Sequence, residues 1–488
     1  MKTLLLNPPS FEKFDGGAGA RWPARREIAS YWYPVWLAYP AGLIKESRLV
    51  DAPPHGISPE ETVRIARDFE FLVLFTSKVG FKNDVKLAEM IKEQNPSIKI
   101  AFVGPPVSVK PEDALNASPA IDFVARKEFD YTVTEFAEGK ELAKIDGVSF
   151  RKGKKIVHNP DRPPVQDLDA LPFITEVYRR DIDPTRYNIP FLKHPYLSFY
   201  TSRGCPARCI YCLWPQTFTG HPWRVRSNEN VVAEVKRALE IFPEVKEIFF
   251  DDDTWAWGKS RVIDLCSHLK PLKFTWSCNS RVHSDYDMLK AMREAGCRLL
   301  VVGFESGVQQ ILDNMKKGIT LEQSLTFMKN CRELGITVHG DFMIGLPGET
   351  KGTVRQTLEF AKRLDPETIQ VSVAHPFPGT EFWNYLETNG YLTDDDMVDE
   401  LGHQLPNFEY PWLNRQEIVD AVEYFYGKYY FRPKVIYRIV RRAIFDSDER
   451  ARLYKEAKDY LTLRARRKKF SGGHIFDKAA QPQAMSCK

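Results

Sequence analysis

The stretch TSRGCPARCIYCLWPQ, residues 201–216, crowds three of the chain's eight cysteines, Cys205, Cys209 and Cys212, into eight positions. Gly204 and Pro206 are typical loop residues, and no buried apolar pattern surrounds the three thiols, so a chance cluster of structural cysteines is disfavoured. The other five cysteines are scattered, and the total is too small and too unevenly spaced for a disulfide framework. The crowding therefore points to chemistry at this loop.

Three thiolates suit some kinds of site better than others. A structural zinc site closes its shell with a fourth ligand, and the chain has no second C-x2-C or H-x3–5-H pair. A redox dithiol needs two cysteines and would leave Cys205 unexplained. Iron–sulfur clusters are held by cysteine thiolates, usually four for a cubane. Three cysteines would leave one iron open, so we expect Cys205, Cys209 and Cys212 to be metal ligands of such a cluster.

The cysteine stretch follows the first of six strand patterns, each of which ends in glycine or polar residues. The first five strands lead into amphipathic helices, one of which begins at residue 228 with Ser227 as its expected N-cap. Six parallel strand–helix units predict a partial (β/α)6 TIM-type barrel over 190–382, with its chemistry on the loops after the strands. The expected strands are YLSFYTSRG, KEIFFDDD, FTWSCNSR, RLLVVGFESG, VHGDFMIGLPG and IQVSVAHPFPG.

The region before the barrel, residues 1–165, also alternates short apolar runs with helical patterns. This alternation predicts a doubly wound parallel sheet covered on both faces, with ligands expected at the carboxyl ends of its strands. The segments NPPS, DAPPHG and GPPV are expected to be turns at those ends. Residues 166–189, which follow a Pro-rich stretch, are expected to be a linker. The fold class is therefore α/β with two parallel sheets.

The end of the chain is richer in basic and aromatic residues. Residues 383–470 are expected to be mostly helical, and 471–488 to be a disordered tail. Between Lys428 and Lys469 there are 15 Lys/Arg against 5 Asp/Glu, whereas the whole chain carries only +4. This basic region is either a solvated helical face or a contact with something anionic. No nucleic-acid reader motif accompanies it, so nucleic acid is not an expected partner.

The chain has no run of about 18 apolar residues, the length that a membrane span requires. The N-terminal MKTLLLNPPS briefly imitates a signal peptide but is better interpreted as a first buried strand. We expect a cytoplasmic protein, peripheral on the inner face of the cytoplasmic membrane if its basic region binds lipid.

The motif C-x3-C-x2-C with Tyr211 before its last cysteine, after the first strand of a partial barrel, resembles the radical S-adenosylmethionine (SAM) superfamily. In that family the three cysteines bind a [4Fe-4S] cluster whose open iron is chelated by SAM. The resemblance implies an enzyme that forms a 5′-deoxyadenosyl radical and removes a hydrogen atom from its substrate. It also implies an electron donor such as flavodoxin or ferredoxin.

The later strand ends match the family's SAM-binding positions. The resemblance assigns the SAM amino group to Asp251, Asp252 and Asp253, the SAM carboxylate to Arg281, the ribose hydroxyls to Glu305 and the adenine side to Tyr211. For each there is a plainer alternative: a solvated acidic strand end, an exposed ion pair or a core aromatic residue. The loops IGLPGET (344–350) and HPFPGTEF (375–382) resemble loops that line the top of the barrel.

The whole of residues 1–165 resembles the cobalamin-binding domain of one subgroup of the superfamily. The subgroup's cobalt-ligating motif, Asp-x-His-x-x-Gly, is absent, because Asp51, His55 and Gly56 stand at the wrong spacing. RKEFDY stands where the usual Gly-Glu precedes the fifth helix. His55 is therefore expected to be an ordinary loop histidine, and cobalamin without a protein ligand stays open.

A closer resemblance covers nearly the whole chain. The segment LNPPSFEKFDGGAGARWPARREIASYWYPVWLAYPAGL resembles the hopanoid-biosynthesis-associated radical SAM family called HpnJ. That family's implied role is to contract the hexosamine ring of a glucosaminyl bacteriohopanetetrol to a cyclitol ether. A hopanoid glycolipid substrate would also explain a basic, aromatic C-terminal region at a membrane surface. The segment's arginines and aromatics, which suit a sugar or inter-domain packing, are Arg21, Arg25, Arg26, Trp22, Tyr31, Trp32, Tyr33 and Trp36.

Other functions remain open at this point. The same chemistry on another substrate would make the protein a cobalamin-dependent radical SAM methyltransferase or an anaerobic tetrapyrrole-type cyclase. A non-enzymatic alternative is an iron–sulfur electron carrier or redox sensor. A pure carrier favours four cysteines and has no use for Glu305 or the three consecutive aspartates.

Overall fold

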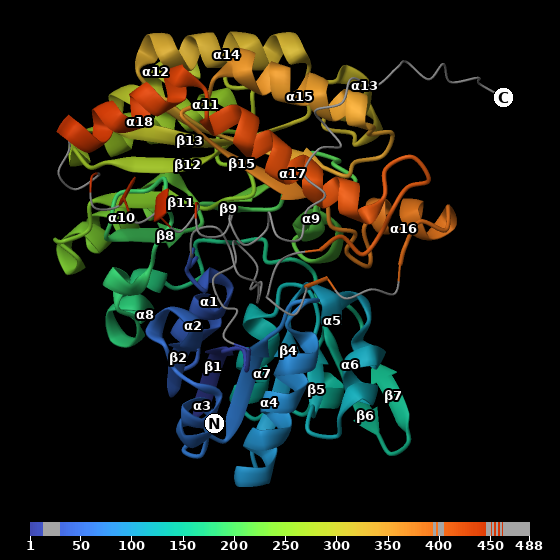
Figure 1. The fold of residues 1–488 in the computed structure, drawn as a ribbon. Coiled ribbons are helices and arrows are strands. Elements are labelled where there is room, and N and C mark those ends of the chain that lie inside the picture. The colour runs from blue at the N-terminus through green and yellow to red at the C-terminus, as the bar shows by residue number, and fades with distance from the viewer. Residues whose placement is uncertain are drawn as a thin grey trace.

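The computed structural model describes residues 1–12, 30–393, 397–398, 405–445, 450, 453–454, 457–458 and 461. Two sheets stand one above the other in Figure 1, with helices around each and a helical C-terminal part along the upper one. The predicted α/β fold class is confirmed. The residues 471–488, which the sequence predicts to be a disordered tail, lie outside the described residues, and the predicted domain boundaries stay predictions.

The N-terminal sheet has the strand order β2-β1-β3-β4-β5-β6-β7. Its first five strands run parallel, and β6 and β7 return antiparallel. All five residues of β3, FLVLF, are buried, as expected for a strand covered on both faces. The order 2-1-3-4-5 is a doubly wound arrangement. The strands are β1 (Thr3–Asn7), β2 (Ser47–Asp51), β3 (Phe71–Phe75), β4 (Lys99–Val103), β5 (Phe123–Ala125), β6 (Val148–Lys152) and β7 (Lys155–His158).

Short helices stand at the carboxyl ends of this sheet where the sequence predicts turns. DAPPHG contains α2 (Ala52–His55) and GPPV begins α5 (Pro105–Val109), so those two turn predictions are wrong. The physical reason is that proline is well tolerated in the first turn of a helix, where its missing N–H has no partner to lose. The other helices of this half are α1 (Val35–Leu43), α3 (Pro59–Ala66), α4 (Phe81–Gln94), α6 (Pro111–Ala117) and α7 (Asp130–Ala137).

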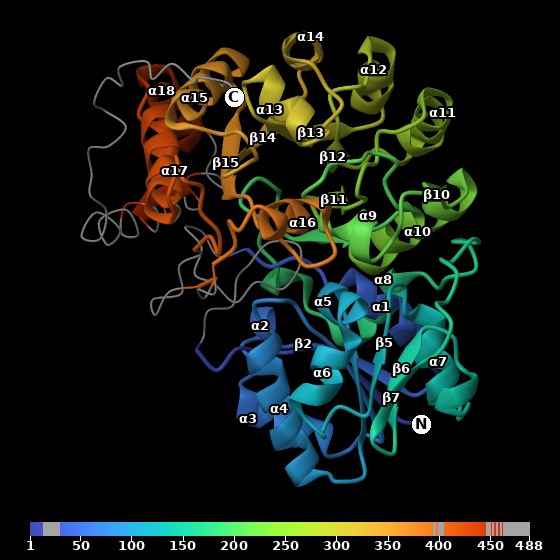
Figure 2. The ribbon, with the colours of Figure 1, turned by 90° about the vertical axis from the view of Figure 1, so that its right-hand side faces the viewer.

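The second sheet has six parallel strands in the order β15-β14-β13-β12-β11-β8, and it curves as an open partial barrel (Figure 2). The N-cap predicted at Ser227 is confirmed, because its side chain accepts from Asn230 N at 3.1 Å. The strands are β8 (Tyr196–Phe199), β11 (Glu247–Phe250), β12 (Trp276–Ser280), β13 (Cys297–Glu305), β14 (Thr337–Ile344) and β15 (Thr368–Val373). The helices are α10 (Asn228–Ile241), α11 (Lys259–Leu269), α12 (Tyr286–Glu294), α13 (Gln309–Asn314), α14 (Leu321–Leu334) and α15 (Lys351–Leu364).

A short pair of antiparallel strands, which the sequence does not predict, joins the two ends of the cysteine loop. Strand β9 (Ser202–Arg203) pairs with β10 (Arg224–Val225), and residues 204–223 form the excursion between them. That excursion contains all three cysteines and the short helix α9 (Leu213–Thr217). The loop is therefore fixed at both of its ends.

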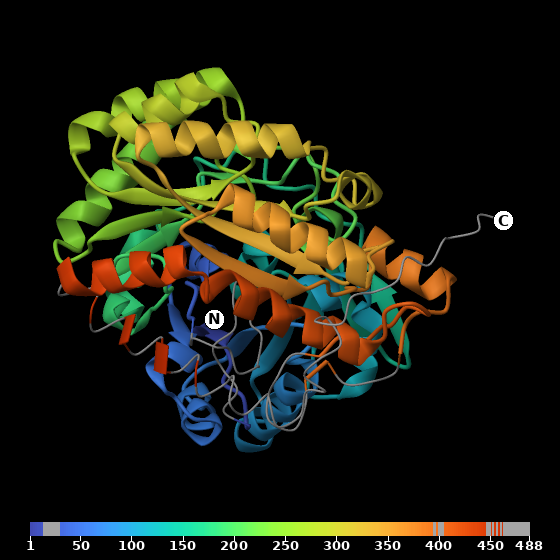
Figure 3. The ribbon, with the colours of Figure 1, turned by 45° about the horizontal axis from the view of Figure 1, so that its top comes forward.

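The C-terminal part covers the free edge of the barrel sheet. Helix α17 (Arg415–Tyr430) lies along β15, as Figure 3 shows, after α16 (Glu381–Thr388) and before α18 (Pro433–Phe445). The hydroxyl groups of Tyr430 and Tyr426 accept hydrogen bonds from the N–H groups of Ile369 and Val371, both at 2.9 Å. Satisfying edge N–H groups in this way protects an exposed strand from pairing with another chain.

The two halves are packed against each other. The predicted linker 166–189 contains α8 (Ile174–Asp181), whose buried Tyr178 donates to Ser198 O at 2.9 Å, so this segment is part of the core. Helix α1 contacts both α7 and α8, and α5 contacts α9. The carboxyl end of β4, which leads into α5, therefore faces the cysteine loop. Among the described residues there is no helix with both the length and the apolarity needed to cross a bilayer.

Candidate functional site

The cysteine loop begins at a position that only glycine can occupy. Gly204 has φ of +86°, and a Cβ on it would lie 2.3 Å from the carbonyl oxygen of Pro222. Both observations exclude a side chain, because the left-handed region favours glycine and the contact is with rigid backbone. The chain can therefore turn directly from β9 into Cys205, and His221 Nδ1 lies 3.1 Å from the Cys205 carbonyl oxygen across the loop.

One glutamine holds the centre of the loop. The Gln216 side-chain nitrogen lies 3.1, 3.0 and 2.9 Å from the carbonyl oxygens of Cys209, Ile210 and Cys212. Its side-chain oxygen accepts from the backbone N–H of Glu381 at 2.8 Å. The sequence suggests only that Leu213–Gln216 faces the barrel top or packs there. The structure gives Gln216 a definite role, which is to join three carbonyl groups of the loop to the start of α16.

The loop is also tied to the barrel through its backbone. The backbone N–H of Ile210 donates to the carbonyl oxygen of Met315 at 3.0 Å. The carbonyl oxygen of Ile210 accepts from the backbone N–H of Phe382, also at 3.0 Å. Backbone groups that are paired on both sides cannot relax without breaking a hydrogen bond. The cysteine positions are thus organised by the protein before any cluster binds.

The burial of the three thiols bears on the predicted cluster. Cys205 and Cys209 are buried and Cys212 is half-buried, and burial raises the pKa values of Cys205 and Cys212. Within the described ranges no three Cys, His, Asp or Glu side chains converge closely enough to hold one ion. A cubane binds its thiolates at separate corners, so its ligands stand farther apart than those of one ion. Thiols that are buried or half-buried on a loop fixed at both ends suit the predicted three-cysteine cluster.

Arg281 lies beside the cysteines and still has hydrogen-bonding capacity. Its Nη1 is 3.7 Å from Cys209 Sγ and its Nη2 donates to the Lys317 carbonyl oxygen. Its Nε is buried, and no hydrogen-bond partner for it is found among the described residues. A guanidinium N–H without a partner, beside the expected cluster ligands, fits the predicted contact with the SAM carboxylate, for which arginine provides a fork of donors.

Tyr211 and Glu305 meet in a buried group. Tyr211 donates from its hydroxyl to Glu305 Oε1 at 2.9 Å, and Lys317 Nζ lies 2.6 Å from the same oxygen. Burial and the nearby Glu305 carboxylate raise the pKa of Tyr211. Glu305 has φ of +63° at a register shift in β13, an unusual conformation for a residue other than glycine. The structure therefore brings together two predicted SAM contacts and adds a lysine.

Lys317 is a member of the site that the sequence does not indicate. Its neighbour Lys316 pairs with Glu381 at the surface, whereas Lys317 is buried and pairs with Glu305. A Cβ on Gly303 would lie 2.2 Å from Glu305 Oε1 and 2.8 Å from Lys317 Nζ. The sequence around the two lysines does not show which of them is buried. The one residue that indicates a crowded site is Gly303, two positions before Glu305.

The three consecutive aspartates play different parts. Asp252 is fully buried and accepts from Thr201 N at 3.0 Å, from Thr201 Oγ1 at 2.9 Å and from Ser202 Oγ. It holds the start of the cysteine stretch and has little capacity left for a ligand. Asp251 accepts from the Asn279 amide at 3.2 Å. Asp253 keeps exposed surface, and its carboxylate lies 3.5 Å from the Thr219 hydroxyl. Of the three, Asp251 and Asp253 suit the predicted SAM ammonium.

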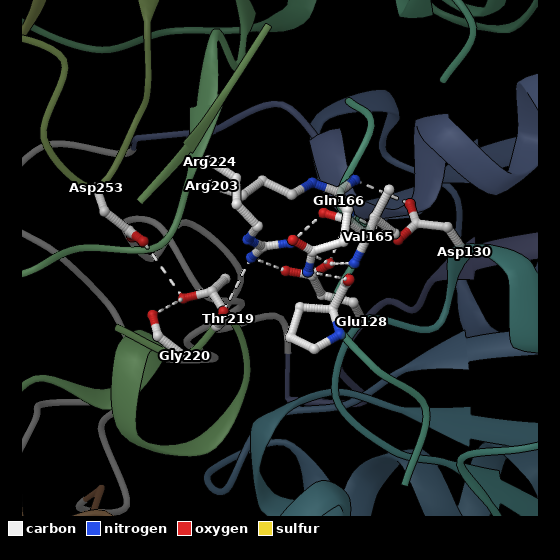
Figure 4. A network of polar contacts seen from close by, with 10 residues as sticks. Glu128, Asp130, Val165, Gln166, Arg203, Thr219, Gly220, Arg224 and Asp253 are labelled. Atoms are coloured by element: carbon white, nitrogen blue, oxygen red, sulfur yellow. Dashed lines mark hydrogen bonds and ion pairs between the residues drawn. The ribbon is translucent and has the colours of Figure 1, made fainter. Parts of the chain in front are cut away.

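A buried network connects this acidic segment to the N-terminal half (Figure 4). Arg203, two residues before Cys205, makes a bidentate pair with Asp130 at 2.8 and 2.9 Å. Arg224 pairs with Glu128 and donates to Thr219 O at 2.9 Å, and the Thr219 hydroxyl lies 3.5 Å from Asp253. All four charged side chains are buried. RKEFDY, which departs from the family pattern, thus supplies both carboxylates of the network.

The charges in this network stabilise each other. Burial acts to lower the pKa of Arg203, but Asp130 and Glu128 outweigh it and raise that pKa. The Arg203 guanidinium also lies 4.5 Å from the ring centre of Trp36 and 4.7 Å from that of Tyr39. Helix α1 therefore contributes aromatic faces to the same junction.

Aromatic residues just before α1 and in its first turn pack between the two halves. Tyr33 is buried, stacks on Tyr187 with ring centres 4.0 Å apart and donates to Tyr196 O at 2.6 Å. Trp36 stacks on Trp214 with ring centres 5.9 Å apart. Of the two alternatives that the sequence leaves open, sugar binding and inter-domain packing, these contacts favour packing for Tyr33 and Trp36. The predicted Arg21, Trp22, Arg25 and Arg26 lie outside the described residues.

His55 is not free to bind cobalt. Its Nδ1 lies 2.8 Å from Asp51 O, and its Nε2 accepts from the backbone N–H of Asp183 at 3.2 Å. Both ring nitrogens are occupied, which agrees with the expectation that His55 is not a cobalt ligand, although it ends helix α2 rather than lying in a loop. A cobalamin on the carboxyl edge of this sheet would bind without a ligand from His55.

The IGLPGET loop packs against the C-terminal part. Tyr410 donates to Gly345 O at 3.0 Å, and Trp412 Nε1 donates to Glu349 O at 2.9 Å. Glu349 is fully buried and accepts from Gly345 N, and burial raises the pKa of its carboxyl to about 8. The HPFPGTEF loop likewise meets α5, because a Cβ on Gly379 would lie 2.7 Å from Val109.

The raised pKa of Glu349 predicts a pH-dependent stability. The folded state holds this proton up to about pH 8, whereas the unfolded chain releases it near its ordinary value of 4.5. The free energy of unfolding should therefore fall by as much as about 1.4 kcal/mol per pH unit between these values. Thermal unfolding of wild type and Glu349→Gln from pH 5 to 8.5 measures this, with the variant gaining relative stability as pH rises. Glu381→Gln, at an exposed pair, is the control; parallel curves for wild type and Glu349→Gln would contradict the prediction.

Comparison with known proteins agrees with this geometry. The model of the radical SAM superfamily matches residues 199–361, and that of the B12 binding domain matches 21–137. An uncharacterized methyltransferase of Pyrococcus horikoshii is 31% identical over 91% of this chain and 97% of its own length. The anaerobic magnesium-protoporphyrin IX monomethyl ester cyclase of Rubrivivax gelatinosus is 25% identical over 88% and 77%.

Another methyltransferase and a solved structure complete the comparison. The cytidylyl-2-hydroxyethylphosphonate methyltransferase of Streptomyces wedmorensis is 24% identical over 87% of this chain and 89% of its own. The structure of the cobalamin-dependent SAM radical enzyme OxsB with aqua-cobalamin covers 95% of this chain and 71% of its own, with a TM-score of 0.68 and 16% identity. At that identity the likeness supports the shared fold.

Proposed function

This chain belongs to the radical SAM superfamily members that carry a B12-binding domain, and on that premise we propose that it is a cobalamin-dependent methyltransferase. It is a radical SAM enzyme, and its domains imply a [4Fe-4S] cluster and SAM. Two relatives along most of its length are named methyltransferases, which supports this class over the others. The electron donor is of the flavodoxin or ferredoxin kind, and the enzyme works in the cytoplasm.

The observation that carries the proposal is the position of the cysteine loop between two parallel sheets. When bound, the cluster would supply a reducing electron, and SAM would supply a radical or a methyl group. Cobalamin would carry the methyl group. Cys205, Cys209 and Cys212 would hold the cluster. Arg281 would orient the SAM carboxylate with its free Nε, and Asp251 or Asp253 would accept from the SAM ammonium. Cys205 and Cys209 are buried, which limits the access of water to that part of the site.

A test of methyl transfer does not require the final acceptor. The anaerobic enzyme is reconstituted with iron and sulfide, loaded with cobalamin, reduced and given SAM. We expect S-adenosylhomocysteine in proportion to the bound cobalamin, because the sulfonium gives up its methyl group to the carrier. Enzyme without cobalamin is the matched control and should release none. Formation of 5′-deoxyadenosine alone, with no S-adenosylhomocysteine at any cobalamin loading, would exclude the methyltransferase proposal.

A second candidate function is ring contraction of a hopanoid glycolipid, as the resemblance to the HpnJ family implies. The resemblance of residues 6–43 supports it, and so does an exposed apolar helix that suits a lipid environment. The probe is glucosaminyl bacteriohopanetetrol with SAM carrying a deuterated methyl group. Ring contraction predicts a five-membered ring without added carbon and equal formation of 5′-deoxyadenosine. A deuterated methyl group in the lipid would instead support methyl transfer.

A further inference from the structure

We propose that the outward side of α18 is a docking surface for an anionic lipid bilayer. The surface consists of Ile436, Tyr437, Val440, Ile444 and Phe445, and is called the α18 apolar face below. Figure 1 shows α18 at the upper left, following α17 along the outside of the barrel.

The helix is attached to the protein by its charged side. Arg438 and Arg442 pair with Glu367 at 3.3 and 3.0 Å. Arg432, just before the helix, pairs with Asp365 at 3.0 Å. Val435 is the one residue of α18 that is fully buried. An amphipathic helix on a globular protein normally buries its apolar stripe and exposes its charges. In α18 the charged side faces the protein and the apolar stripe faces outward, so the stripe is available to bind a partner.

The α18 apolar face is concentrated and strongly exposed. Residues 436, 437, 440 and 444 follow the i, i+1, i+4, i+8 spacing of one helical stripe. Tyr437 is 68% exposed, Ile444 60% and Phe445 81%. Together the five residues make up a large part of the exposed large hydrophobic side chains among the described residues. Contiguous exposed apolar surface of this kind marks an interaction site.

Charge decides which partner fits. Arg441 lies exposed beside the stripe, and so does Lys434, which also pairs with Asp365 at 2.8 Å. Residues 428–469 carry 15 Lys/Arg against 5 Asp/Glu. Two copies of this face in a symmetric dimer would bring two strongly positive regions together, which is unfavourable. An amphipathic helix with a basic border and Tyr, Phe and Ile on its apolar side suits the interface of an anionic membrane. This inference is independent of the proposed function, because lipid binding needs neither cluster nor SAM.

Vesicle co-sedimentation of the full chain tests the inference. We expect binding to phosphatidylglycerol vesicles and little binding to phosphatidylcholine vesicles, with the difference reduced at high salt. The double variant Tyr437→Ser/Ile444→Ser should lower the partition coefficient at least tenfold. Ile263→Ser/Val225→Ser removes two exposed apolar residues elsewhere and is the matched control, expected within twofold of wild type. Circular dichroism confirms that each variant is folded.

A charge variant keeps the test decisive if the double variant does not fold. Arg441→Gln leaves the pairs with Glu367 and the apolar face intact and should weaken binding about fivefold. Equal binding to neutral and anionic vesicles, or wild-type binding by both variants, would overturn the inference. A dimer in light scattering that Tyr437→Ser/Ile444→Ser abolishes would also overturn it, because the face would then bind a second copy.

Discussion

Cys209→Ala is expected to abolish iron–sulfur cluster assembly and all formation of 5′-deoxyadenosine. Cys209 is buried on a loop whose carbonyl groups are fixed by Gln216, so no other thiol can move into its place. Loss of a ligand from a site with three leaves two, which cannot hold a cubane with one open iron. Iron and sulfide analysis after anaerobic reconstitution measures the loss, together with chromatography of the SAM products.

The matched control is Cys331→Ala, which removes a buried thiol from the core. It should retain the iron content and SAM cleavage of wild type, because Cys331 lies in α14, away from the cysteine loop in the sequence and bonded to none of its residues. If Cys209→Ala retains the cluster and the 5′-deoxyadenosine, the assignment of the three metal ligands is wrong.

The second large effect is expected from the junction between the two halves. Asp130→Asn removes the charge that neutralises Arg203 in a site where both side chains are fully or nearly fully buried. Removing one partner of such a pair leaves an uncompensated buried charge and lowers the free energy of unfolding by about 3–5 kcal/mol. Urea denaturation followed by fluorescence should show this fall in the free energy of unfolding.

Asp161→Asn is the control for this effect. Asp161 is about half exposed, and its buried partner Arg126 also donates to Ser149 and to the Asn159 carbonyl oxygen, so its loss should cost less than that of Asp130. The double variant Asp130→Leu/Arg203→Met should recover much of the stability lost by Asp130→Asn, because it removes both charges together. Equal, small effects of Asp130→Asn and Asp161→Asn would show that the network does not support the junction.

Much of the site could be predicted because its ligands are close together in the sequence. Cysteine spacing needs no tertiary information, and the ends of parallel strands meet at one edge by topology alone. Lys317 could not be predicted, because it differs from Lys316 only in the direction its side chain takes after α13. In the sequence, Asp252 is indistinguishable from Asp251 and Asp253. In the structure its side chain points toward Thr201 at the end of the strand.

The differences in the fold have a similar cause. Pro-rich segments favour both turns and the first turn of a helix, and only packing decides between them, as it does for α2 and α5. The β9–β10 pair is two residues long on each side, too short to leave a pattern. Helix α1 contains Pro40 and is apolar on nearly all sides, so its sequence has no helical periodicity, and the contacts that bury it come from both halves.

The most direct test of the central claim is electron paramagnetic resonance of the reduced, reconstituted enzyme before and after SAM is added. If three cysteines leave one iron open and Arg281 helps to place SAM there, the signal of the reduced cluster should change shape with SAM and the change should saturate. Arg281→Gln should need a higher SAM concentration for the same change. A signal that SAM leaves unaltered at any concentration would contradict the account and favour a simple electron carrier.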